Sequence, residues 1–335
     1  MEKIEVKIFQ VRCGDCISIV YQNCDKKYSI IVDSGYANTY HRTLKNEIKF
    51  LNEIDLFIVT HTDNDHIGGM QSFITQYSKL PVKQFLYNFS PIDIDVSPNI
   101  VNKKSIKQGM KLRDYLLKYS NVNKEPVTIG YTSTIEDTIN LKAISPSEQS
   151  LHYFKEKWGF WENKAPAKTD YRTSIEDFKG EDFTKDTSPS NRSSIAFILE
   201  IKDFKMLLLG DAHASILVDG LKHWGHSSEN RIKVNYVKLS HHGSEGNINQ
   251  ELIDMIDCEN YIISTDGSKH GLPNKKTLAK IILSRNKAPT SIIYNYKNNI
   301  TSKIFTETEQ QDYNINPLFP NEGDMFYKIN HIFND

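Results

Sequence analysis

Apolar and polar residues alternate along the first thirty-five positions, a pattern typical of short strands joined by turns. The strands expected there cover residues 4–11, 17–21 and 28–32. After a helical stretch around residues 40–51 comes a nearly continuous apolar run at residues 54–60, which indicates a strand buried on both faces. The chain is therefore expected to start as a β-meander and to continue as a layered α/β structure.

The remaining pattern predicts further helices and strands. Apolar residues recur at helical spacing at about residues 70–77, 103–119 and 277–284. Extended patterns are found within residues 127–145 and at residues 194–201, 205–209, 234–239 and 260–264. The two strands at 194–201 and 205–209 are separated by three residues, so we expect them to form a hairpin.

Two segments lack this regularity. Residues 151–190 are polar and irregular, which predicts an insertion or a lid. Residues 288–335 are rich in Asn, Thr and Tyr and are expected to form a β-rich C-terminal appendage. We therefore expect one domain over residues 1–287, with the insertion at about 151–190 and the appendage packed on the same domain.

Composition narrows the class of protein. The 335 residues include 41 basic and 42 acidic side chains, a net charge of -1, so overall charge gives no argument for nucleic-acid binding. No apolar stretch approaches the length of a membrane span, and the first residues alternate charged with aliphatic side chains, unlike a secretory signal. The sequence therefore predicts a soluble, cytoplasmic protein without a membrane partner.

The four cysteines are Cys13, Cys16, Cys24 and Cys258. Without an export signal they are expected to be reduced thiols. Cys13 and Cys16 form a C-x-x-C, but no second pair completes a zinc cage, so a structural role is the simpler interpretation.

Several predicted strands end in side chains that bind metals well. These side chains are His61, Asp63, Asp65, His66, Asp211, His241, His242 and His270. In layered α/β folds the carboxyl ends of strands meet in one crevice, where ligands collect. We therefore expect these imidazoles and carboxylates to form a single metal site.

The cluster at residues 61–66 favours two ions over one. Four ligands within six residues cannot all bind one ion without strain, but they can be divided if His61 and Asp63 point one way and Asp65 and His66 the other. A carboxylate such as Asp211 could bridge the two ions, and a water shared by both would be acidified to hydroxide near neutral pH.

The run His61-Thr62-Asp63-Asn64-Asp65-His66 is similar to the hallmark H-x-H-x-D-H of the metallo-β-lactamase superfamily, with Asp63 in place of the second histidine. This variant resembles the metallo-β-lactamase domain of ComEC-type DNA-uptake proteins. Further resemblances to that family are found at Cys13-Gly14-Asp15, Asp33-Ser34-Gly35, Gly210-Asp211, Ser240-His241-His242-Gly243-Ser244 and His270-Gly271-Leu272-Pro273. The resemblance implies an α/β fold of the four-layer αβ/βα sandwich type, two bound metals and hydrolysis.

The chain departs from the superfamily pattern in one important place. The superfamily often supplies another histidine between the hallmark and the bridging aspartate, and the stretch Ser190–Ser194 contains none. The first metal would then have fewer ligands or bind more weakly.

Roles can be assigned to these residues as expectations. The expected metal ligands are His61, Asp63, Asp65, His66, Asp211, His241 and His242, and hydrolysis is expected to depend on Asp65 and His270. Because neighbouring residues on a strand point to opposite faces, one of His241 and His242 is expected to be the ligand, with His241 slightly favoured. His270 suits either a late ligand or a general acid. Asp33 is expected to support a ligand, and the substrate contacts are expected at Asn191, Ser193, Ser244 and Lys269.

The function predicted from this site is dinuclear metal-dependent hydrolysis, with a metal-bridging hydroxide as nucleophile and a phosphodiester or nucleic acid as the preferred substrate. Two basic stretches, at residues 103–118 and 269–287, and the aromatic residues Trp158, Phe160 and Trp161 could contact such a substrate. The alternatives are a hydrolase of small esters, lactones or thioesters, and a binding or regulatory protein without catalysis. A mixed His and Asp ligand set suits two divalent ions, Zn²⁺ before Mn²⁺ or Fe.

Overall fold

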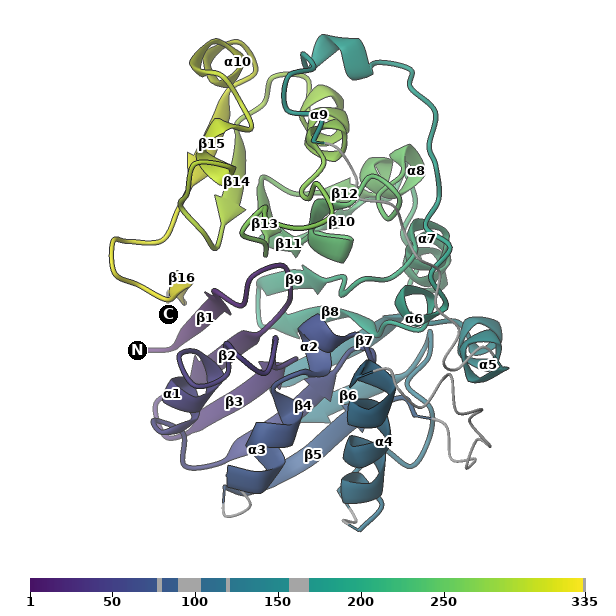
Figure 1. Ribbon diagram of the computed structural model, residues 1–335, viewed down its shortest axis with the longest axis vertical. Helices are drawn as coiled ribbons and strands as arrows, with labels where there is room; N and C mark the ends of the chain where they lie inside the picture. Colours follow the sequence, from purple (N-terminus) through teal and green to yellow (C-terminus); the bar gives the residue numbers. More distant parts are fainter. Residues whose placement is uncertain (77–79, 90–103, 119–120, 157–168, 334–335) are drawn as a thin grey trace.

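The computed structural model describes residues 1–76, 80–89, 104–118, 121–156 and 169–333. Two mixed β-sheets lie face to face, and helices cover the outer face of each (Figure 1). The α/β fold of the four-layer αβ/βα type expected from the sequence is confirmed. Trp158, Phe160 and Trp161 lie outside the described residues.

The first sheet has six strands. Their order across the sheet is β16 (Phe326–Ile332), β1 (Lys3–Phe9), β2 (Ile17–Gln22), β3 (Lys27–Val32), β4 (Ile54–Val59) and β5 (Val82–Tyr87). The meander β1–β3 is antiparallel, as expected, and β3, β4 and β5 run parallel. The sequence pattern did not predict β5, because Lys83 and Gln84 put polar residues into its first half.

The second sheet has eight strands. Their order is β15 (Ile315–Leu318), β14 (Thr290–Tyr294), β13 (Asn260–Ile263), β11 (Tyr236–Lys238), β9 (Phe204–Leu208), β8 (Ala196–Ile201), β7 (Ile139–Ser145) and β6 (Thr132–Ile135). Strands β8 and β9 form the expected hairpin, and β9, β11, β13 and β14 are parallel. A separate pair joins β10 (Ile232–Lys233) to β12 (Ile256–Asp257).

Alternate residues of the central strands enter different cores, which explains their continuous apolar runs. Leu56 and Ile58 of β4 face the core between the sheets, whereas Phe57 and Val59 face the helices outside. In β9, Met206 faces the core between the sheets, whereas Leu207 faces the helices outside. Each such strand is therefore buried on both faces.

The helices fall into two groups. The outer face of the first sheet is covered by α1 (Leu44–Ile48), α2 (Asn64–Ile67), α3 (Met70–Gln76) and α4 (Lys104–Leu116). The outer face of the second sheet is covered by α7 (Ala214–His223), α8 (Gln250–Asp254) and α9 (Lys275–Ser284). The helix predicted around residues 40–51 is shorter than expected, since residues 37–43 form turns. None of the helices among the described residues is long and apolar enough to cross a membrane.

The two irregular segments contain short elements. Within and beside residues 151–190 lie α5 (Glu148–Glu156), a 3₁₀ turn at Glu176–Phe178 and α6 (Pro189–Arg192). Ile175 and Phe178 are buried in the outer core of the second sheet. Residues 288–335 supply β14 and β15 to the second sheet, α10 (Glu307–Asp312), and β16 to the edge of the first sheet.

Candidate metal centre

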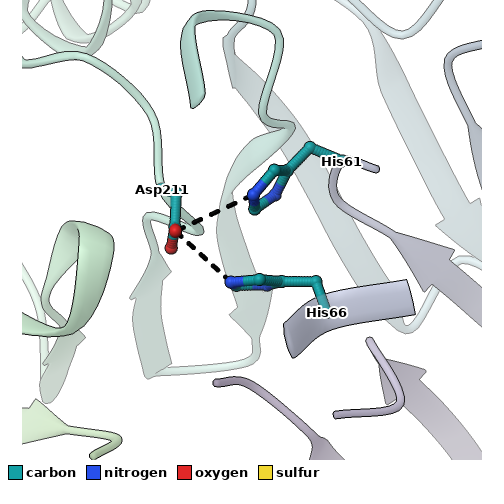
Figure 2. Close-up of side chains that lie close together, drawn as sticks. All are labelled: His61, His66 and Asp211. Carbon is teal, nitrogen blue, oxygen red and sulfur yellow. Dashed lines mark ion pairs between the residues drawn. The ribbon is translucent and has the colours of Figure 1, made fainter. Parts of the chain in front are cut away.

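The loops that follow four parallel strands meet at one end of the two sheets. Asp33 follows β3 and His61 follows β4 in the first sheet, while Asp211 follows β9 and His241 follows β11 in the second. Figure 2 shows how the two sheets contribute: Asp211 Oδ2 lies 3.8 Å from His61 Nε2 and 3.3 Å from His66 Nε2. Residues separated by about 150 positions are thus within reach of a shared ion.

The turn at residues 61–66 divides its four polar side chains into two groups. Asp63 is the N-cap residue of α2, but its side chain makes no capping hydrogen bond; instead Asp63 Oδ2 lies 3.8 Å from His61 Nε2. Asp65 and His66 lie on α2, where Asp65 Oδ2 is 3.9 Å from His66 Nε2. A simple polar turn would not produce this arrangement, because the carboxylates face imidazoles and not the helix end.

His241 and His242 both face the centre, so the premise that they lie on an extended strand is wrong. Each adopts a left-handed backbone conformation, with φ of 46° and 56°. This turn brings both rings to the same side: His241 Nε2 lies 3.9 Å from Asp211 Oδ2, and His242 Nε2 lies 3.8 Å from it. His242 Nε2 is also 3.5 Å from Asp65 Oδ2.

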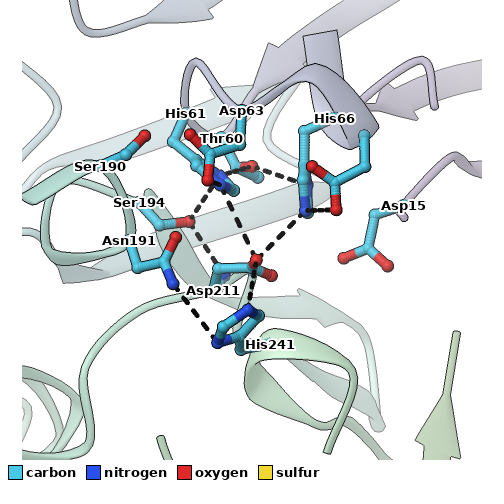
Figure 3. A network of polar contacts seen from close by, with 12 residues as sticks. Asp15, Thr60, His61, Asp63, His66, Ser190, Asn191, Ser194, Asp211 and His241 are labelled. Atoms are coloured by element: carbon cyan, nitrogen blue, oxygen red, sulfur yellow. Dashed lines mark hydrogen bonds and ion pairs between the residues drawn. The ribbon is translucent and has the colours of Figure 1, made fainter. Parts of the chain in front are cut away.

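These distances define two half-sites that share Asp211. We assign His61, Asp63 and His241 to the first half-site, because His61 contacts Asp63 and both imidazoles contact Asp211. Asp65, His66 and His242 form the second half-site. His61 also lies close to His66, and together with Asp211 they form a group whose ligand atoms lie within 4.8 Å of one another. Asn191 lies beside His241, with Asn191 Nδ2 3.3 Å from His241 Nδ1 (Figure 3). The two-ion arrangement expected from residues 61–66 stays a prediction, and the different contacts of Asp63 and Asp65 favour it.

The chemistry of the centre fits divalent cations. His61, His66 and His242 have buried Nε2 atoms without a hydrogen-bond partner among the described residues, and so does Asp211 Oδ1. Unpaired polar atoms in a protein interior are costly, and a bound ion would satisfy all of them. Nitrogen and carboxylate oxygen donors of this kind are typical of Zn²⁺ and other transition metals.

The negative charge of the centre also favours bound cations. Six carboxylates gather in and around the centre, and Lys238, which is 1% exposed and bonded to Asp15, lies among them. The carboxylates are those of Asp15, Asp33, Asp63, Asp65, Asp186 and Asp211. Two divalent cations would neutralise most of this charge.

The pKa values show what the carboxylates do to the imidazoles. Burial opposes the charged form of His66, but Asp211, Asp33 and Asp65 together outweigh it and raise its pKa well above the usual range. For His61, burial and then the neighbouring positive charge on His66 lower the pKa to about 4. Burial, followed by the charge of Asp65, raises the pKa of Asp63 to about 6. The proton on His66 therefore supplies part of the positive charge that a bound cation would otherwise supply.

The thiols do not take part. Burial raises the pKa of Cys13 to about 12 and that of Cys16 well above the usual range, so neither offers a thiolate near neutral pH. The structural role predicted for this pair agrees with their burial.

Asp33 supports the second half-site from behind. Its carboxylate accepts hydrogen bonds from Thr60 N at 2.8 Å and Thr60 Oγ1 at 2.7 Å, and lies 2.8 Å from His66 Nδ1. Because His66 Nδ1 donates to this carboxylate, His66 Nε2 is directed toward Asp211. The supporting role expected for Asp33 remains a prediction, and this geometry favours it.

We expect Asp33→Ala to weaken metal binding at one site by about 10- to 100-fold, because His66 would lose the partner that orients it. The free energy of unfolding should fall by roughly 3 kcal/mol, since Asp33 is fully buried and several donors would lose their acceptor. Calorimetric metal titration and urea unfolding measure the two effects. Asp25→Ala, which removes an exposed carboxylate, is the control, and equal metal affinity in both variants would contradict the supporting role.

Lys269 and His270 lie at the rim of the centre. Lys269 is exposed, with Nζ 4.9 Å from the centre of the Tyr36 ring. His270 has a left-handed φ of 59°, and partial burial, followed by the charge of His241, lowers its pKa. Its imidazole is therefore neutral at neutral pH, which favours a ligand or a base over the expected general acid.

Other expected substrate contacts are placed differently by the structure. Asn191 and Ser193 are each 2% exposed; Asn191 contacts Asp186, and Ser193 Oγ donates to Ser190 O. Both side chains are buried and make internal hydrogen bonds, which disfavours contact with a substrate, and their expected role stays a prediction. Ser244 is half-buried, and its Oγ accepts a hydrogen bond from Gly246 N. His213, a histidine outside the candidate ligand set, is mostly buried, with 13% of its side chain accessible.

Three of the six basic residues at positions 269–287 serve the fold. Lys275 is 2% exposed and bound to Glu309, Lys276 pairs with Glu181 and Glu245, and Arg285 donates to Pro289 O. These cations are therefore not free to bind phosphate. Lys269 is the member of the stretch that lies at the rim.

Sequence reasoning missed four residues around the centre as contributors. They are Asp15, Asp186, Lys238 and Asn247. Asp15 belongs to the Cys13-Gly14-Asp15 motif, but the sequence assigned no function to its side chain. No pattern in the sequence marks Asp186 or Asn247. Lys238 lies at the end of a predicted strand, where a charged residue flanked by apolar neighbours was the one available signal.

Comparison with known proteins gives weak similarities. No family model matches the chain, and no curated protein matches it. Among solved structures, the metallo-β-lactamase fold protein YhfI of Bacillus subtilis has 10% identity and a TM-score of 0.45, covering 99% of this chain and 100% of that one. A metallo hydrolase of the archaeon Ignicoccus hospitalis has 11% identity and a TM-score of 0.43, covering 99% and 100%. CmlA, a diiron β-hydroxylase of Streptomyces venezuelae, has 10% identity and a TM-score of 0.44, covering 97% of this chain and 54% of CmlA. The candidate site is thus defined by the side chains of this chain alone.

Proposed function

We propose that the protein is a dinuclear metal-dependent hydrolase and that its substrates are phosphodiesters. The observation that carries this proposal is the pair of half-sites joined by Asp211, whose carboxylate lies within 3.9 Å of four imidazole nitrogens. When bound, two divalent cations supply an activated water as nucleophile and stabilise the negative charge that develops on the substrate.

The residues of the chain have separate tasks in this proposal. The two half-sites would hold the ions, and Asp211 is the carboxylate that both half-sites share. Asp33 fixes the orientation of His66, and Lys238 compensates the charge of Asp15. The lowered pKa of His270 keeps its imidazole neutral at neutral pH, so it is suited to act as a further ligand or as a base. The mixed ligand set is compatible with Zn²⁺, Mn²⁺ or Fe.

Two features favour phosphodiesters over neutral esters. The variant motif His61–His66 resembles that of ComEC-type domains, for which nuclease or phosphodiesterase activity is implied. Lys269 is an exposed cation at the rim, where its Nζ lies over the Tyr36 ring. Arg12 is also exposed, and its positive charge favours the ionised form of the same Tyr36 phenol. A phosphodiester carries a negative charge that these side chains would attract.

A substrate panel tests the proposal. The full chain loaded with Zn²⁺ or Mn²⁺ is expected to hydrolyse bis-p-nitrophenyl phosphate faster than p-nitrophenyl acetate, and a chelator should stop both reactions. Faster turnover of the acetate would favour an ester hydrolase instead. A chain that binds two equivalents of metal and hydrolyses neither substrate would contradict the enzymatic assignment.

Lys269→Ala separates the two substrate classes more sharply. We expect KM for the phosphodiester to rise by about threefold to tenfold, because the variant loses an exposed charge at the rim, while KM for the neutral acetate stays the same. Lys303→Ala, which removes an exposed lysine from a 3₁₀ turn, is the control. An equal change in KM for both substrates would contradict recognition of charge.

A further inference from the structure

Asp186 is remote in sequence from every candidate ligand, yet its carboxylate is buried behind His241. Only 2% of its side chain is accessible. Asp186 Oδ2 accepts hydrogen bonds from Asn191 Nδ2 at 2.6 Å and from Asn247 Nδ2 at 3.2 Å, and Asp186 Oδ1 accepts one from Ser188 N at 3.0 Å. A buried carboxylate with this many donors has a defined orientation.

The same two amides contact His241. His241 Nδ1 lies 2.9 Å from Asn247 Oδ1, 3.3 Å from Asn191 Nδ2 and 3.6 Å from Asp186 Oδ2. The amide of Asn247 can point only one way, because its Nδ2 also approaches Asp211 O at 3.1 Å and Ala212 O at 3.3 Å, and these carbonyls accept. Asn247 Oδ1 is therefore the acceptor, and His241 Nδ1 must be the donor.

A donating Nδ1 leaves His241 Nε2 as the free nitrogen on the side of Asp211. This is the relation between a metal-binding histidine and its outer partner that orients the ring and fixes the position of its hydrogen. Here the partner is an amide held by a carboxylate, so Asp186 acts on His241 mainly through Asn247. The left-handed backbone of His241 makes such an external restraint necessary, since that conformation is costly for a residue with a side chain.

The main chain anchors Asp186 in the same place. Asp186 N donates to Gly246 O at 2.9 Å, which joins residues 184–188 to the loop after His242. A Cβ atom on Gly246 would lie 3.1 Å from Asp186 N and 3.3 Å from Thr184 O, so a glycine is what allows the two segments to approach this closely. The segment is thus tied to the metal centre by both its backbone and its side chain.

We propose that Asp186 is a positioning residue of the first half-site: through Asn247 it holds His241 with Nε2 toward Asp211. This inference rests on the proposed metal centre and assigns a role to residues 184–188, which were expected to belong to a lid. They form a fixed wall of the centre.

Metal titration of the full chain tests the proposal. Mn²⁺ is added to metal-free protein in a calorimeter, and the wild type is expected to bind two equivalents. Asp186→Asn should weaken one of the two sites by about 10- to 100-fold and leave the other unchanged. Asp182→Asn, an exposed carboxylate four residues earlier, is the matched control and should behave as the wild type.

Double variants show whether Asp186 acts through His241. In the His241→Ala background, Asp186→Asn should cause no further loss of Mn²⁺ affinity, whereas in the His242→Ala background its effect should add to that of His242→Ala. A purely structural role would lower affinity equally in both backgrounds. If Asp186→Asn does not fold, Asn247→Ala, which removes the acceptor for His241 Nδ1, is measured in the same two backgrounds.

The outcomes separate the two levels of the proposal. A wild type that binds no divalent cation overturns the metal centre and this inference together. A wild type that binds two equivalents, with Asp186→Asn unchanged or with additive losses in the His241→Ala background, overturns the role of Asp186 alone.

Discussion

Asp211→Asn is expected to lower the rate of bis-p-nitrophenyl phosphate hydrolysis by about a thousandfold or more. Asp211 is the one carboxylate that approaches nitrogens of both half-sites among the described residues, and asparagine keeps its shape while removing the charge. Loss of a shared ligand removes several kcal/mol of transition-state stabilisation, and about 4 kcal/mol corresponds to a thousandfold in rate. The measurement is kcat/KM at saturating metal, together with the number of metals bound.

A matched control shows that the effect belongs to the site. Asp219→Asn removes an exposed carboxylate from α7, eight residues further along the chain, and should leave the rate unchanged. Both variants should have the circular dichroism of the wild type. A rate in Asp211→Asn within about tenfold of the wild type would show that the shared carboxylate is not needed for the chemistry.

Removing divalent cations is expected to lower the free energy of unfolding at pH 8 by about 3 to 4 kcal/mol for each of the two sites, relative to protein in metal at 100 to 1,000 times the dissociation constant. The cations would bind the folded chain, where the carboxylates of the centre are brought together, and the unfolded chain has no such site. Urea unfolding with and without chelator measures the difference. Asp211→Asn provides the control, because its stability should depend much less on metal.

The stabilisation by metal should fall as the pH is lowered. Burial opposes the charged form of His241, but Asp211 and Asp186 outweigh it and raise the pKa of His241 to about 9, so this ring is protonated at neutral pH in the metal-free protein. Binding must displace that proton, and below pH 6 it must also displace one from Asp63, whose pKa burial raises to about 6. The effect of the cation should therefore be largest near pH 9, smaller at pH 7 and smallest at pH 5. An effect that grows toward low pH would contradict the ligand assignment.

Sequence patterns identified the elements that are buried on both faces. The runs at residues 54–60 and 205–209 became β4 and β9, and the hairpin of β8 and β9 was placed correctly. Such strands are visible because every position must be apolar when both faces are covered. The sequence pattern did not predict strand β5, because Lys83 and Gln84 make its first half polar and only partly buried. Its place in the sheet therefore follows from its pairing with β4, which the apolar pattern of β5 does not reveal.

The candidate site also has one part that the sequence revealed and another that it did not. Residues 61–66 could be assigned from sequence because a polar turn or a helix cap after a buried strand does not require two histidines beside two aspartates. The relation of His241 to His242 could not, since it depends on two left-handed residues that direct adjacent rings to one side. Sequence alone cannot show a backbone conformation that is held by contacts with distant segments.

The sequence by itself determined the layered α/β class, the strands of the inner layers and the ligand types at their ends. Only the tertiary structure decided how those ligands are shared between two half-sites, and which buried residues support them. Asp186, Asn247 and Lys238 reach the centre from segments far from residues 61–66, and each makes a hydrogen bond to a residue more than thirty positions away. The physical reason is that a pattern along the chain records which face of an element is buried, whereas a polar contact between distant segments leaves no such periodicity.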